Sequence, residues 1–175
     1  MLWLSKQPRR SVVYISLGSI VLLRLDQIEE LAFALEASQQ RFLWVLRSPD
    51  SSSADREVLP EGFRGERGLV VRDSWVPQLA ILGHESTGVF LTHCGWNSVL
   101  EGLCMGVLML TLPSFSDQAL NSRMVEELQV AWRVSKTSTD RLSRHSIEGL
   151  IRRAMEEPRQ KIESLMATAR NIKIL

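Results

Sequence analysis

The chain has 175 residues, of which 45% are hydrophobic and 23% charged, which is the composition of an ordinary globular domain. Its 21 basic and 20 acidic residues leave a net charge of +1, so charge gives no reason to expect binding to nucleic acid or to an anionic membrane. No apolar run reaches the roughly 18 residues of a transmembrane helix, and the first ten residues are too polar for a signal peptide. The two cysteines, Cys94 and Cys104, make no disulfide framework, and we expect both to be reduced in a cytoplasmic protein.

Short apolar segments alternate with amphipathic segments along the chain. The apolar segments end at turn residues and predict strands at 11–17, 42–46, 69–71, 89–92, 107–112 and 130–134. The amphipathic segments predict helices at 25–35, 77–82, 98–104, 117–128 and from 143 to Pro158, and the remainder to Leu175 is also expected to be helical. The serine-rich stretch 48–55 predicts a flexible surface loop. Strands that are apolar on both faces and alternate with helices predict an α/β fold with a Rossmann-like, doubly wound parallel sheet.

Polar clusters follow four of the predicted strands. They are Gly18-Ser19, Asp73-Ser74-Trp75, His93 to Ser98, and Ser114 to Gln118. In doubly wound sheets, ligands bind at the carboxyl ends of the strands, and parallel strands bring these ends to one edge. The sequence therefore predicts a ligand site at that edge.

The stretch FLTHCGWNS at 90–98 places a histidine, a glycine and two capping residues at a bend between a strand and a helix. Asn97 or Ser98 can cap the helix, and Ser98 with Glu101 matches a capping box. The same helix N-terminus can instead bind an anion, because its free backbone N–H groups and the helix dipole face the end of the strand. The spacing leaves both interpretations open. They differ at Glu101, which can cap the helix or bind a ligand.

His93 fits neither a metal site nor a hydrolase site by its spacing. A metal would need partners at ligand spacing, and the chain has no CxxC or HxxxH pattern. Ser98 lacks the GxSxG elbow of a hydrolase nucleophile. Only one glycine follows the first strand, so the GxGxxG fingerprint of nicotinamide and flavin enzymes is missing. His93 is left as a core histidine, a base or a phosphate donor.

The other polar clusters also have two interpretations each. Trp75 either packs in the core or stacks on a ligand, and Gln78 can offer a donor and an acceptor to the edge of a base. Asp117 and Gln118 either cap a helix or hold neighbouring hydroxyls of a sugar. The residue types alone do not choose between these interpretations.

Taken together, residues 75–118 (WVPQLAILGHESTGVFLTHCGWNSVLEGLCMGVLMLTLPSFSDQ) resemble the signature box of plant secondary-product UDP-glycosyltransferases. The upstream stretches QPRRSVVYISLGS and FLWVLRSP resemble the same family. The resemblance implies one half of a GT-B fold, in which two Rossmann-like domains face each other. This chain, 1–175, resembles the C-terminal, UDP-sugar-binding domain, and we expect the N-terminal acceptor domain to be absent from it.

The resemblance also implies a role for each site residue. Trp75 would stack on uracil, Gln78 would lie at the uracil edge, and Glu101 would accept the two ribose hydroxyls. The pyrophosphate would be held by Ser19, His93, Asn97 and Ser98. The sugar would be lined by Trp96, Asp117 and Gln118, and glutamine at this last position is associated with glucose donors. The sequence departs from the family pattern at Leu108, where proline is usual, and at Leu112, where tryptophan is usual.

The implied function is the binding of UDP-glucose for inverting transfer of the sugar to a hydroxyl of a small lipophilic acceptor. UDP-sugar would be a co-substrate, and neither cofactor nor metal is expected. The family's catalytic base is a histidine of the N-terminal domain, and none of His84, His93 and His145 matches it, so we expect no catalytic residue in this chain and no activity from it alone. The alternative is a non-catalytic fragment that binds nucleotide sugars. A Rossmann-type scaffold without a ligand would make the whole 75–118 match a coincidence.

Overall fold

A computed structural model describes residues 1–19, 21–47, 58–137, 141–158, 160, 162–164 and 167. The predicted loop at 48–55 lies outside the described residues, as does most of the predicted helical tail. The strands are β1 (Val12–Ser16), β2 (Arg41–Leu46), β3 (Gly68–Arg72), β4 (Thr87–Thr92), β5 (Leu108–Thr111) and β6 (Ala131–Arg133). The helices are the 3-10 turn η1 (Leu4–Lys6), α1 (Leu25–Ser38), α2 (Gln78–Leu82), α3 (Trp96–Met105), α4 (Gln118–Glu127) and α5 (Arg144–Glu156).

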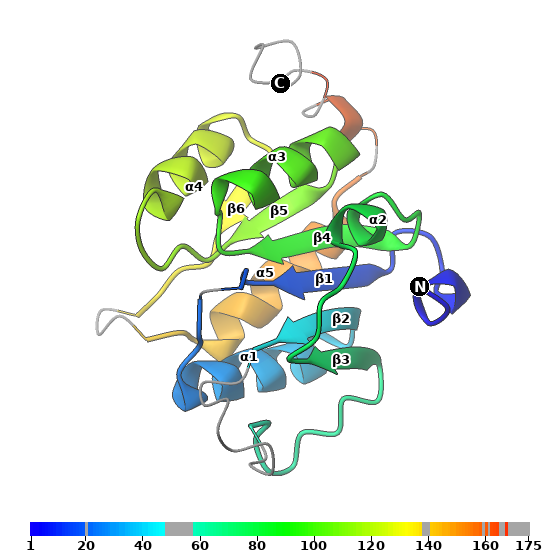
Figure 1. Ribbon diagram of the computed structural model, residues 1–175, viewed down its shortest axis with the longest axis vertical. Helices are drawn as coiled ribbons and strands as arrows, with labels where there is room; N and C mark the ends of the chain where they lie inside the picture. Colours follow the sequence, from blue (N-terminus) through cyan, green and yellow to red (C-terminus); the bar gives the residue numbers. More distant parts are fainter. Residues whose placement is uncertain are drawn as a thin grey trace.

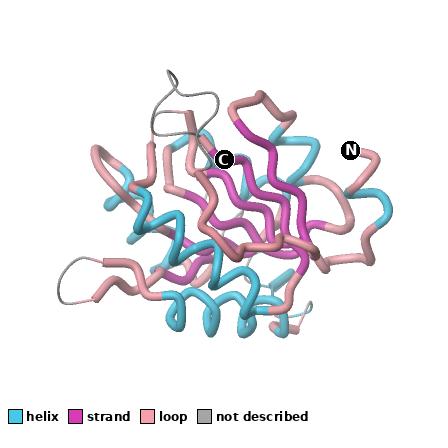
Figure 2. The backbone as a smooth tube through the Cα atoms, turned by 90° about the horizontal axis from the view of Figure 1, so that it is seen from below, coloured by secondary structure: helices cyan, strands magenta, loops and turns pink. Residues whose placement is uncertain are grey.

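The six strands form one sheet in the order β3-β2-β1-β4-β5-β6, and every neighbouring pair is parallel. Among the helices, α1 packs against α5, while α2 and α4 both pack against α3, so the helices form two groups (Figure 1). Figure 2 shows the twisted strands in the middle of the molecule with the helices around them. The predicted α/β fold with a doubly wound parallel sheet is confirmed.

The centre of the sheet is fully enclosed, which explains why its strands are apolar on both faces. All five residues of β1 and all six of β4 are buried. Parallel strands covered by helices on both sides need apolar side chains in both directions, and valine, isoleucine and leucine supply them here. The core therefore follows the continuous apolar runs that predicted the strands.

Helix boundaries differ from the predicted ones where the cap is unusual. We predicted the end of α1 at residue 35, but the helix continues to Ser38 and ends at Gln39, which adopts a left-handed conformation with φ of 58°. Glycine is the usual residue at such a position, so the sequence contained no clear stop signal. Among the residues that the structure describes, no helix is both long and apolar enough to cross a membrane.

The parallel sheet brings the four polar clusters to one edge, as predicted. They follow β1, β3, β4 and β5, and the arrowheads of β1, β2 and β4 point to this edge at the left of Figure 1. Three of these loops contain a non-glycine residue with positive φ, namely Asp73 at 45°, Cys94 at 66° and Ser116 at 57°. Strained backbone of this kind is concentrated at functional sites in proteins. We call this edge, with its loops, the carboxyl edge.

Candidate functional site

Helix α3 begins directly after β4, with no side-chain cap in the described part of the chain. Its N-cap residue is Gly95, and the first helical hydrogen bond runs from the Val99 N–H to the Gly95 carbonyl at 3.1 Å. Asn97 and Ser98 therefore lie inside the first turn, so the prediction that they cap the helix, alone or in a capping box with Glu101, is wrong. The left-handed turn before Gly95 starts the helix two residues earlier than predicted. The first-turn N–H groups and the positive end of the helix dipole remain directed at the carboxyl edge.

His93 lies between the turn after β1 and the start of α3. A Cβ atom added at Gly18 would lie 2.6 Å from its Nε2, and one added at Gly95 would lie 2.5 Å from the same atom. Both glycines are therefore needed for the imidazole to fit. Its Nδ1 is buried and has no hydrogen-bond partner among the described residues, which leaves Nε2 as the nitrogen that a ligand can meet. Burial lowers the pKa of His93 and so favours the neutral ring, and the carboxylate of Asp117 only partly opposes this.

Two tryptophans of the site are exposed rather than packed in the core. Trp75 is 81% exposed and Trp96 is 42% exposed. Core packing is therefore the wrong interpretation for Trp75. A large apolar ring left in solvent on a loop next to polar residues is typical of a surface that binds a ligand or a partner. Ser19, in the turn after β1, is also exposed.

Gln78 connects α2 with α3 and with β1. Its amide nitrogen donates to Glu101 Oε2 at 2.7 Å and to Ser98 Oγ at 3.1 Å. Its carbonyl oxygen accepts from the Tyr14 hydroxyl at 3.1 Å. Three predicted site residues thus meet in one hydrogen-bond network, and Tyr14, which sequence reasoning placed only in a strand, joins them. A strand that is apolar on both faces gives no sequence signal for such a contact.

Asn121 is a second residue that sequence reasoning missed. Its side chain is buried in α4, and its amide nitrogen donates to the Cys94 carbonyl at 3.0 Å and to Asp117 Oδ2 at 2.7 Å. Asn121 thus joins the left-handed residue before α3 to the carboxylate at the start of α4. The spacing of four residues from Asp117 is the only trace of this role in the sequence.

Asp117 and Gln118, the predicted sugar-lining residues at the start of α4, differ in burial and in hydrogen bonding. Asp117 is exposed at the N-cap position, but its side chain caps no backbone N–H in the described structure. Gln118 is buried, and its carbonyl oxygen accepts from the backbone N–H groups of Ser114 at 2.9 Å and Phe115 at 3.2 Å. Gln118 therefore shapes the loop after β5, while the Asp117 carboxylate faces solvent.

The other two histidines lie outside the four polar clusters of the carboxyl edge. His84 Nδ1 accepts from the backbone N–H of Ser86 at 3.2 Å, and its Nε2 lies 3.3 Å from Ser5 Oγ, in agreement with a structural role. His145 is exposed in the first turn of α5. No group of three or more histidine, cysteine, aspartate or glutamate side chains that could hold a metal is found within the described ranges.

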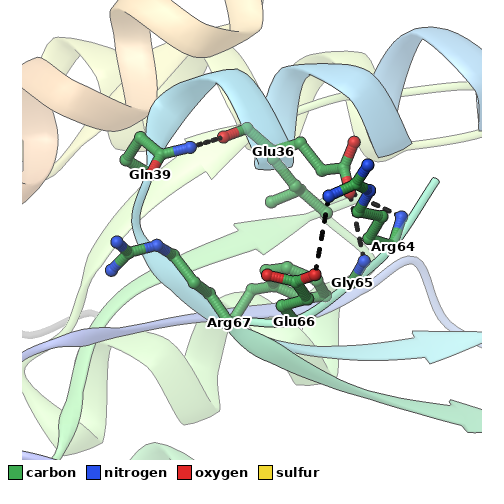
Figure 3. Close-up of a pocket in the computed structure, with 8 residues that line it drawn as sticks. Glu36, Gln39, Arg64, Gly65, Glu66 and Arg67 are labelled. Atoms are coloured by element: carbon green, nitrogen blue, oxygen red, sulfur yellow. Dashed lines mark hydrogen bonds and ion pairs between the residues drawn. The ribbon is translucent and has the colours of Figure 1, made fainter. Parts of the chain in front are cut away.

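A hollow of about 320 Å³ lies at the opposite, amino edge of the sheet and includes none of the predicted site residues (Figure 3). The Glu36 carboxylate there accepts from the backbone N–H groups of Arg64 and Gly65, at 2.6 and 3.1 Å. Arg64 also faces Glu66 at 3.9 Å. The polar groups of this hollow thus hold the loop that leads into β3, and we assign them a structural role.

Comparison with known proteins shows which family the chain belongs to. The family model described as UDP-glucoronosyl and UDP-glucosyl transferase matches residues 2–170. The chain belongs to this family. UDP-glycosyltransferase 72E1 of Arabidopsis thaliana is 44% identical over 95% of the chain and 39% of its own length. A zeatin O-xylosyltransferase of Phaseolus vulgaris is 48% identical over 89% of the chain and 37% of its own length.

A solved structure of a plant UDP-glycosyltransferase confirms the expected fold. UGT2 of Phytolacca americana, complexed with UDP-2fluoro-glucose and pterostilbene, is 38% identical with a TM-score of 0.84 over 98% of this chain. The match covers 38% of that protein. The chain thus corresponds to well under half the length of the UDP-glycosyltransferases it matches.

Proposed function

We propose that this chain is the nucleotide-sugar-binding part of a UDP-glycosyltransferase, and that it binds a UDP-sugar at the carboxyl edge. The observation that carries the proposal is the uncapped first turn of α3, which opens beside His93 and is followed one turn later by Glu101. Gln78, three residues after the exposed Trp75, is hydrogen-bonded to this helix. Free backbone N–H groups at a helix N-terminus are a ready site for a diphosphate. The family membership agrees with this ligand.

In our proposal, different side chains at the carboxyl edge bind the pyrophosphate, the uracil and the ribose. The pyrophosphate lies over the start of α3, where Asn97 and His93 Nε2 face it and Ser19 borders it from the turn after β1. Trp75 stacks on uracil, a contact worth about 1–3 kcal/mol per base. The Glu101 carboxylate accepts the ribose hydroxyls, as a charged acceptor worth about 1.5–3 kcal/mol.

We propose UDP-glucose as the donor. Gln118 and the exposed carboxylate of Asp117 support this, because they lie at the loop where the sugar would extend from the pyrophosphate. The relatives differ in the sugar that their names give, since one is a xylosyltransferase and a solved relative holds a glucose analogue. Competition between UDP-glucose, UDP-galactose and UDP-xylose for the isolated chain measures this choice, and weaker binding of UDP-glucose than of both others would contradict it.

In the complete enzyme, we propose that an acceptor hydroxyl of a small lipophilic molecule loses its proton to a base and attacks the anomeric carbon in line. The glycosidic C–O bond to UDP breaks as the new bond forms, and the configuration inverts. UDP leaves with its negative charge held by the start of α3 and by Asn97, which is electrostatic stabilisation that is already oriented before the reaction. UDP-sugar is a co-substrate in this scheme, and we assign no cofactor.

Titration calorimetry with UDP tests the proposal on the 175-residue chain. Stacking, the ribose contact and the helix N-terminus together predict a dissociation constant of roughly 0.1 mM. Glu101→Ala should weaken UDP at least tenfold and lower the melting temperature only modestly, because Glu101 caps no helix and its loss removes one half-buried hydrogen bond from Gln78. The matched control is Glu127→Ala, at the far end of α4, where the pair with Arg123 is exposed. Absence of a heat signal at millimolar UDP, from chain shown by circular dichroism to be folded, would refute the proposal.

A further inference from the structure

The carboxylate proposed to bind ribose is held in place by a line of hydrogen bonds that starts in the middle of the sheet. Tyr14 is the third residue of β1, Gln78 is the first residue of α2, and Glu101 lies in the second turn of α3. The Tyr14 hydroxyl donates to the Gln78 carbonyl at 3.1 Å, and the Gln78 amide nitrogen donates to Glu101 at 2.7 Å. Consecutive hydrogen bonds thus join Tyr14 to Gln78, 64 positions away in the sequence, and Gln78 to Glu101, 23 positions away.

The donors and acceptors allow one orientation of the Gln78 amide. Its two N–H bonds point to Glu101 Oε2 and to Ser98 Oγ, and its oxygen points to the Tyr14 hydroxyl. Turning the amide over would place its oxygen against the Glu101 carboxylate, which accepts hydrogen bonds but cannot donate one. Both amide hydrogens are therefore used within the protein, and Gln78 has none left for the uracil edge predicted from the sequence.

The far end of this line is rigid. Tyr14 is fully buried between β2 and β4, and its ring stacks on Phe90 with centroids 5.2 Å apart and planes 16° apart. Burial raises the pKa of Tyr14 to about 12, so the hydroxyl keeps its proton and remains a donor throughout the neutral range. A fixed donor in the core thus sets the amide, and the amide sets the carboxylate.

We propose that Tyr14 and Gln78 are positioning residues that fix the Glu101 carboxylate for the two ribose hydroxyls. This rests on the proposed function, in which Glu101 binds ribose. Holding a carboxylate in its bound rotamer before the ligand arrives removes part of the entropy cost of binding. Tyr14 itself touches no ligand, since it is closed off from solvent.

The test compares UDP with 2′,3′-dideoxy-UDP, which has no ribose hydroxyls, in calorimetry on the 175-residue chain. Tyr14→Phe removes the hydroxyl and keeps the ring on Phe90. We expect it to weaken UDP by about threefold to tenfold, the effect of one buried hydrogen bond, and to leave dideoxy-UDP unchanged. Gln78→Leu should show the same selectivity with a larger loss, and because Gln78 is only half-buried it serves if Tyr14→Phe does not fold. In the Glu101→Ala background, Tyr14→Phe should have no further effect on UDP.

Thr87→Val is the matched control, because it also removes a buried hydroxyl, one that donates to the Ile81 carbonyl at 2.6 Å away from the carboxyl edge. It should lower stability without changing the ratio of the two affinities. An equal loss for UDP and dideoxy-UDP in Tyr14→Phe and in Gln78→Leu, or no loss for either ligand, would overturn the positioning role. A wild-type chain that binds neither nucleotide would instead show that the proposed function is wrong, and equal binding of both would remove the ribose contact of Glu101.

Discussion

At the scale of single residues, the site depends on the space that two glycines leave for a neighbouring histidine ring. Gly18 and Gly95 come from different loops, and each lies where a Cβ atom would meet the imidazole of His93. Gly18 also has a φ of 81°, so a substitution there would add backbone strain to the clash. Gly95 has a φ of −59°, which any residue can adopt, so only the clash would remain. The second glycine therefore gives the cleaner measurement of what the position of His93 contributes.

Gly95→Ala should displace the His93 ring and weaken UDP by about tenfold, the cost of a lost charge-assisted hydrogen bond. Calorimetry with UDP measures the change. The matched control is Gly149→Ala in α5, where an added Cβ atom meets nothing within 4 Å, and which should raise helix stability by about 1 kcal/mol without altering UDP affinity. Wild-type affinity in Gly95→Ala would show that His93 is not a phosphate contact.

At the scale of elements, the start of α3 is held from α4. The left-handed residue Cys94 places Gly95 at the N-cap, and its buried carbonyl has a partner in Asn121. The same amide reaches Asp117, so the position of the proposed sugar-lining carboxylate is coupled to the first turn of α3. The loops after β4 and β5 are therefore joined through one buried side chain.

Asn121→Ala should cost about 1–3 kcal/mol of unfolding free energy, because it leaves the Cys94 carbonyl buried without a donor. UDP-glucose should be weakened more than UDP, since the change frees Asp117 as well as the turn. Chemical denaturation and calorimetry measure the two effects. Arg123→Ala, also in α4 but in an exposed ion pair, is the control and should change stability by less than about 0.5 kcal/mol. If UDP and UDP-glucose lose affinity equally, Asp117 is not coupled to the sugar.

At the scale of the whole molecule, the parallel sheet gathers the proposed site along one open edge. Trp75, Trp96, Asn97 and Asp117 are all exposed there. His93 is the one histidine in the four polar clusters at this edge, and it is wedged between two loops with one nitrogen buried. A base needs hydrogen-bond reach to the acceptor hydroxyl, and this imidazole is proposed to serve the pyrophosphate instead.

The 175-residue chain should therefore bind UDP but should not transfer glucose to a phenolic acceptor. Incubation with UDP-glucose and a phenol, followed by mass spectrometry for the glucoside, tests this. A full-length plant UDP-glycosyltransferase treated in the same way is the positive control. Glucoside formed by the pure wild-type chain but not by Glu101→Ala would show that a base is present in this chain.

Much of the architecture followed from local patterns. The strand positions and the gathering of four polar clusters at one edge depend on apolar periodicity and on the rule that parallel strands share an edge, and both were confirmed. Boundaries were less predictable. The end of α1 at Gln39 and the start of α3 at Gly95 depend on backbone angles that cannot be predicted from these residue types.

The sequence by itself determined the fold class, because apolar spacing along the chain sets the strands and helices. The resemblance of residues 75–118 to a family's signature box indicated the family and the segment that forms the candidate site. Only the tertiary structure decided which side chains are exposed and which are hydrogen-bonded within the protein. It showed that Trp75 stands in solvent, that Glu101 caps no helix, and that Gln78 donates its hydrogens within the protein. It also added Tyr14 and Asn121, whose partners are 64 and 27 positions away. A side chain's hydrogen bonds and exposure depend on neighbours that only folding brings together, and spacing along the chain does not encode them.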